Sequence, residues 1–142
     1  MNKIAVVYWS GTGNTEEMAK AVVSGIKDAG AAAEIFEVES FAADKINDYA
    51  AIAFGCPAMG DEVLEESCFE PFFAAAEEKI NDKAVALFGS YGWGGGAWLD
   101  DWRARTENAG AKISGTLAVE NSPNEDDIAA CEELGKNLAA AI

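Results

Sequence analysis

The segment that decides the fold is YWSGTGNT, residues 8–15, where a short apolar run meets a loop of small polar residues. The run extends from Ile4 to Trp9, and Ser10 with Gly11 ends it. Beyond the loop, apolar or small residues at positions 18, 22, 25 and 26 share one helical face before Gly30. This spacing predicts a strand, a tight loop and a helix in direct succession.

The same alternation continues along the chain. Apolar runs predict further strands over residues 33–38, 50–55, 84–89 and 113–119, and apolar stripes predict helices over 69–80, 98–109 and 128–142. Residues 39–48 favour neither state. Parallel strands need long, right-handed crossovers. We therefore expect one α/β domain over residues 1–142: a three-layer sandwich with a five-stranded parallel sheet, order 2-1-3-4-5, covered by helices on both faces.

The charge composition makes some classes of binding partner unlikely. The formal net charge is −15, from 10 Lys and Arg against 25 Asp and Glu, and histidine is absent. Such a chain lacks the basic stripe that binds nucleic acid or anionic lipid, so we expect neither partner. An acidic surface favours protein partners with basic surfaces. Added salt slows the association with such partners.

The cysteines and the N-terminal sequence give an expectation for the cellular compartment. Cys56, Cys68 and Cys131 are odd in number and lack the close spacing of zinc or iron–sulfur ligands. The sequence shows no signal peptide and no apolar stretch of about 18 residues. We expect a monomer in the reducing cytoplasm, without a bound metal.

Glycines mark a binding crevice. Nine of the 14 glycines lie at or just beyond the carboxyl ends of the first, third and fourth predicted strands, at positions 11, 13, 55, 60, 89, 92, 94, 95 and 96. In an open α/β sheet, ligands bind at this edge, next to the point where the strand order reverses. Three loops are therefore expected to converge on one site.

The first loop, residues 10–15, predicts a phosphate cradle. It offers backbone N–H groups, three hydroxyls and one amide at the start of a helix. No lysine follows the glycines, as a Walker loop requires, and Glu16 stands where a dinucleotide fingerprint needs glycine. A single phosphate monoester fits best, and an ordinary helix-capping turn is the alternative.

The other two loops predict a slot for a flat ring. Residues 56–62 combine a proline, Met59 and two carboxylates, while residues 90–96 carry two aromatic side chains among glycines. Met59 opposite Trp93 would form two walls of the slot. The tryptophans Trp9, Trp98 and Trp102 are instead expected in the core or at its edge.

Residues 8–15, 55–62 and 89–94 together closely resemble the three FMN-binding loops of short-chain flavodoxins. Flavodoxins are themselves the standard example of the 2-1-3-4-5 order. The resemblance implies a low-potential one-electron carrier, not an enzyme, that holds FMN non-covalently and shuttles electrons between a reductase and an acceptor enzyme. It would cycle mainly between semiquinone and hydroquinone.

The resemblance also implies roles for particular residues. The loop 10–15 would bind the FMN phosphate, Met59 and Trp93 would flank the ring, and Glu62 would accept from flavin N3–H. The backbone of Asp61 and Gly92 would bind the pyrimidine edge, and Asn121 the ribityl chain. The implied set is Ser10, Gly11, Thr12, Gly13, Asn14, Thr15, Pro57, Ala58, Met59, Gly60, Asp61, Glu62, Ser90, Tyr91, Gly92, Trp93, Gly94 and Asn121.

Three positions depart from the family pattern. Pro57 offers neither a hydroxyl nor an N–H, and Gly95 and Ser122 stand where relatives are often acidic. Phosphate donors and potentials are therefore expected to differ slightly from those of relatives.

Two features would tune the redox potentials. Glycine tolerates positive φ, so the Gly60–Asp61 peptide can turn its carbonyl toward flavin N5. Carboxylates at positions 61, 62, 65 and 66 would oppose the added charge of the reduced flavin.

Other classes of function fit less well. An FMN-dependent NAD(P)H:quinone or flavin reductase would need a second site, for which the chain shows no further nucleotide loop. A phospho-receiver needs an acidic pair where Ser10 and Gly11 stand. A low-molecular-weight phosphatase needs an arginine after its nucleophile, which Cys56 lacks.

Overall fold

The fold is a three-layer α/β sandwich built on one parallel sheet. The computed structural model describes residues 3–11, 13–59, 63–92 and 96–142. Its strands are β1 (Lys3–Tyr8), β2 (Ala32–Glu37), β3 (Ala51–Gly55), β4 (Ala84–Tyr91) and β5 (Lys112–Glu120). They pair in the order β2-β1-β3-β4-β5, and every pairing is parallel. The predicted fold class and strand order are confirmed.

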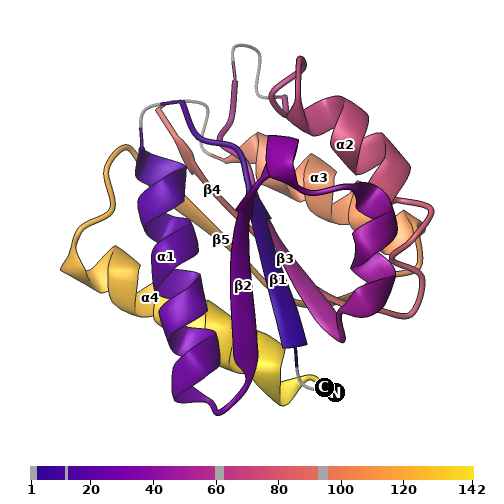
Figure 1. The fold of residues 1–142 in the computed structure, drawn as a ribbon. Helices are drawn as coiled ribbons and strands as arrows, with labels where there is room; N and C mark the ends of the chain where they lie inside the picture. The colour runs from indigo at the N-terminus through magenta and orange to yellow at the C-terminus, as the bar shows by residue number, and fades with distance from the viewer. Residues whose placement is uncertain (1–2, 12, 60–62, 93–95) are drawn as a thin grey trace.

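Helices cover both faces of the sheet (Figure 1). They are α1 (Asn14–Asp28), α2 (Phe69–Ala76), α3 (Ala97–Asn108) and α4 (Glu125–Ala140). Successive strand residues point to opposite faces, so Val7 packs with α2 and α3 while Val6 packs with α1 and α4. No described helix is both long and apolar enough to span a bilayer.

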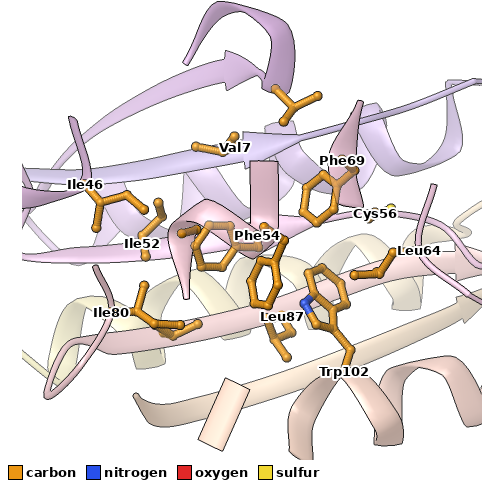
Figure 2. Close-up of a cluster of buried hydrophobic side chains, with 14 of the residues drawn as sticks. Val7, Ile46, Ile52, Phe54, Cys56, Leu64, Phe69, Ile80, Leu87 and Trp102 are labelled. Atoms are coloured by element: carbon orange, nitrogen blue, oxygen red, sulfur yellow. The ribbon is translucent and has the colours of Figure 1, made fainter. Parts of the chain in front are cut away.

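The α2–α3 side of the core is aromatic. Phe54, Phe69 and Trp102 pack together there (Figure 2), and all three side chains are at most 2% exposed. The Trp102 indole N–H is buried without a hydrogen-bond acceptor among the described residues. Its ring meets the Phe73 ring edge to face, with centroids 5.7 Å apart, which gives the indole an aromatic neighbour in place of an oxygen.

The elements differ from the sequence predictions in several places. The predicted helix 69–80 ends at Ala76, although Ile80 stays fully buried in the turn that follows. Residues 39–48 contribute to two short 3₁₀ helices, Val38–Ser40 and Ala43–Asp48. Strand β4 continues to Tyr91 because β5 runs beside it, with Ser90 opposite Val119.

Helices α1 and α4 touch through their backbones. A Cβ on Gly25 would lie 1.9 Å from the carbonyl oxygen of Glu132, and one on Gly135 would lie 2.2 Å from that of Val22. Only glycine permits this approach. The two helices therefore pack closer than side chains would allow.

Candidate functional site

A cleft lies at the carboxyl ends of β1, β3 and β4. Its volume is about 270 Å³, close to the lower end for small-molecule sites. The described residues that line it are Trp9, Gly11, Asn14, Pro57, Ala58, Met59, Ser90, Tyr91, Gly92 and Asn121. Segments far apart in the sequence thus meet at the edge where the glycine pattern predicted a site.

The first loop presents hydrogen-bond donors to this cleft. The Ser10 hydroxyl oxygen accepts from the amides of Gly13 at 3.1 Å and Glu16 at 3.3 Å. Both lone pairs are thereby used, so the Ser10 O–H remains available as a donor. The first two amides of α1, on Asn14 and Thr15, have no acceptor within the described parts of the chain. Free donors at a helix N-terminus favour an anion.

Thr15 is more buried than the other described residues of the first loop. Its Oγ1 lies 3.3 Å from the Ser90 Oγ, and the two residues are 1% and 6% exposed. This contact joins the start of α1 to the end of β4. It holds the first loop against the strand that carries the third.

The second loop begins in sheet-like pairing. The Cys56 amide donates to Phe88 at 3.0 Å, and the Ala58 amide donates to the carbonyl of Ser90 at 3.0 Å. Met59 and Val63 then exchange two backbone hydrogen bonds of 2.9 and 3.1 Å. Met59, which lines the cleft, is therefore held beside Val63 in an antiparallel backbone pair.

Beneath this loop the backbone is densely packed. A Cβ on Gly89 would lie 2.1 Å from the Cys56 carbonyl oxygen. That oxygen also accepts from the Trp98 indole N–H at 3.3 Å. Burial raises the pKa of the Cys56 thiol far above its usual range, so this cysteine is an inert part of the floor.

A fourth segment, residues 121–124, closes the cleft. Asn121 adopts φ 58° and donates its amide to the Tyr91 carbonyl at 2.7 Å, and its side-chain oxygen lies near Gly92. The Ser122 hydroxyl donates to Asn14 Oδ1 at 3.2 Å. The segment after β5 is thus linked both to the third loop and to the first.

The structure brings together most of the predicted site residues that it describes. Ser90 and Tyr91 belong to β4 rather than to a loop. Ser10, Gly13 and Thr15 are not among the described residues that line the cleft, although each is a neighbour of one that does. Thr12, Gly60, Asp61, Glu62, Trp93 and Gly94 lie outside the described residues, as does Gly95.

Sequence reasoning missed two neighbours of the site. Trp9 is half-buried at the core edge, as expected, but it also lines the cleft beside Gly11. Its place directly before Ser10 was the available signal. Ser122 was noted only as a departure from the family, and nothing local predicts its contact with Asn14.

The donor set suits a phosphorylated aromatic molecule. No Lys or Arg is among the described residues that line the cleft, so neutral donors and the α1 dipole would hold the phosphate. Pro57, Ala58, Met59 and Tyr91 offer apolar surface for a ring. These features fit FMN. In the described regions, no group of three His, Cys, Asp or Glu side chains is placed to bind a metal.

Comparisons with known proteins point the same way. The family model described as flavodoxin matches residues 6–135. The chain is 47% identical over 138 residues to a Megasphaera elsdenii flavodoxin, covering 97% of this chain and 99% of that one. It is 46% identical over 135 residues to a Clostridium beijerinckii flavodoxin, covering 94% and 97%. The solution structure of two-electron reduced M. elsdenii flavodoxin superposes with a TM-score of 0.90 at 47% identity, covering 96% and 98% of the two chains.

Proposed function

Because the chain belongs to the flavodoxin family, and is an FMN electron carrier rather than an enzyme, we propose that it binds FMN in the cleft between loops 10–15, 56–62 and 90–94. The observation that supports this site most directly is the pair of amides on Asn14 and Thr15 that lack an acceptor among the described residues, close to the Ser10 hydroxyl. When bound, FMN supplies the one-electron redox chemistry.

The residues of the chain have three tasks in this proposal. Amides and hydroxyls of the first loop bind the phosphate, while Asn121 binds the ribityl chain. Met59, Tyr91 and Trp93 cover the ring and exclude water from it. Carboxylates of residues 61–66 raise the cost of adding negative charge, which lowers the second one-electron potential.

The partners are redox proteins. We propose that they are a reductase donor and an acceptor enzyme with basic surfaces, because the chain carries a net charge of −15. Association with such partners should slow steeply as ionic strength rises. We also propose that the protein is a single-domain monomer in the reducing cytoplasm. Its three free cysteines are consistent with that compartment.

A visible spectrum with acid extraction tests the cofactor. Purified protein should show flavin bands, release FMN rather than riboflavin or FAD, and accept two electrons in separate one-electron stages. Folded protein that neither contains nor takes up FMN would refute the proposed site. Under anaerobic conditions NADH alone should leave the bands unchanged, since rapid bleaching would favour the reductase alternative.

A further inference from the structure

Glu65 carries a buried carboxylate whose hydrogen bonds give it a second task besides the charge that it places near the cleft. Its residue is 5% exposed, although it lies in an acidic surface segment. Oε1 accepts from the amides of Cys68 at 2.8 Å and Phe69 at 2.9 Å. Oε2 accepts from the Ser67 amide at 2.9 Å and also from the Ser67 hydroxyl. The carboxylate is therefore held in one orientation at the start of α2.

These contacts explain why a charge is tolerated there. Burial raises the pKa of the Glu65 carboxyl, but hydrogen bonds from Ser67, Phe69 and Cys68 outweigh burial and leave that pKa below its usual value. The amides belong to the N-terminal end of α2, where the helix dipole favours an anion. Glu65 is therefore ionised and fully engaged at neutral pH.

The main chain of Glu65 connects this anchor to the cleft. Its amide donates to Cys56 Sγ at 3.4 Å, and its carbonyl accepts from the Glu70 amide at 2.8 Å. Two residues earlier, Val63 pairs with Met59 in an antiparallel backbone bridge. Cys56 on the sheet and Glu65 at α2 are thus fixed points on either side of this bridge.

Helix α2 is itself a rigid support. Arg105 of α3 donates to both carboxylate oxygens of Glu70, at 2.8 and 2.6 Å, and to Glu77 at 2.8 Å. Its guanidinium lies 5.0 Å from the centre of the Phe73 ring. Phe69, the first residue of α2, is fully buried beside Phe54 and Trp102 (Figure 2). Movement at the start of α2 is therefore opposed by both the core and α3.

We propose that Glu65 is a positioning residue for FMN, whose carboxylate fixes the backbone pair Met59–Val63 relative to α2 and so places the Met59 wall of the cleft. The inference rests on the proposed FMN site. Glu65 acts through Val63 and Met59, without touching the cofactor. Charge alone does not give it this role, because its neighbour Glu66 carries the same charge on an exposed side chain.

That neighbour supplies the matched control. Glu65→Gln and Glu66→Gln each remove one negative charge from adjacent positions, and only the first disturbs the hydrogen-bonded anchor. The readouts are the dissociation constant of FMN from titration of the apoprotein, both one-electron potentials, and the thermal stability of the apoprotein. Loss of a negative charge near an anionic cofactor should by itself leave FMN binding equal or tighter. Weaker FMN binding in Glu65→Gln would therefore indicate that the wall of the cleft has moved.

We expect Glu66→Gln to keep the FMN dissociation constant within twofold of wild type, and Glu65→Gln to raise it at least tenfold. The first one-electron potential should be more negative in Glu65→Gln than in Glu66→Gln. Ser67→Ala leaves both charges and removes one hydroxyl donor, so it should raise the dissociation constant about threefold. If Glu65→Gln fails to fold, Ser67→Ala tests the proposal in its place.

Equal FMN affinities and equal first potentials for the two glutamine variants, both folded by circular dichroism, would overturn the proposal. Wild-type affinity in Ser67→Ala would also overturn it. Wild-type protein that bound no FMN would refute the proposed function itself, and this inference with it.

Discussion

Replacing Ser10 by alanine separates the two tasks of its hydroxyl. In the apoprotein this oxygen caps α1 by accepting from the amides of Gly13 and Glu16 at 3.1 and 3.3 Å. Loss of such a cap costs about 1 kcal/mol, which lowers the melting temperature of a domain this size by about 3 °C. In the complex the same hydroxyl would donate to the FMN phosphate.

A hydrogen bond to a charged group contributes about 1.5–3 kcal/mol. The Ser10→Ala variant should therefore bind FMN about 10- to 100-fold more weakly. Fluorescence titration of the apoprotein with FMN and with riboflavin checks this expectation, because riboflavin lacks the phosphate. The affinity for riboflavin should change less than about fivefold, the most that loss of a cap of about 1 kcal/mol could cause. An equal loss for both ligands would refute the assignment of Ser10 to the phosphate.

Three further outcomes are expected. Gly135→Ala places a Cβ 2.2 Å from the Val22 carbonyl oxygen, so urea denaturation should show a loss of about 2 kcal/mol. Gly60→Ala should make the first one-electron potential more negative by about 40 mV in a spectroelectrochemical titration, if one net hydrogen bond of about 1 kcal/mol is lost. The lowered pKa of Glu65 means that its stabilising contribution is complete above its usual value of 4.5 and is lost as pH falls through the lower folded value. Unfolding free energies measured from pH 6 to pH 3 should fall less in Glu65→Gln than in wild type.

The sheet and the position of the cleft could be predicted because they depend on local patterns. Buried parallel strands appear as continuous apolar runs, and glycines gather where backbone approaches a ligand. The end of β4 could not be placed in this way. Ser90 and Tyr91, next to a run of glycines, have a composition typical of loops, and they pair as a strand because β5 continues alongside. Tertiary pairing overrides local preference there.

The hydrogen bonds that link distant segments around the cleft could not be predicted from the local sequence, for a different reason. Ser122 and Asn14 are 108 positions apart, and nothing near either one predicts their contact. Glu65 is one of 25 acidic residues, and in sequence it is indistinguishable from its exposed neighbour Glu66. The role of Glu65 depends on the burial of its side chain and on the hydrogen bonds that its carboxylate accepts. Both arise only when α2 packs on the sheet.

The glycine crossing of α1 and α4 has a consequence for how this protein can vary. Helix α1 begins beside the cleft at Asn14, and α4 follows the segment whose Asn121 lines the cleft. Main chain meets main chain where the two helices cross at Gly25 and Gly135, so no side chain sets their separation at these two points. Substitutions on the outer surfaces of these helices should therefore leave the spacing at the crossing unchanged.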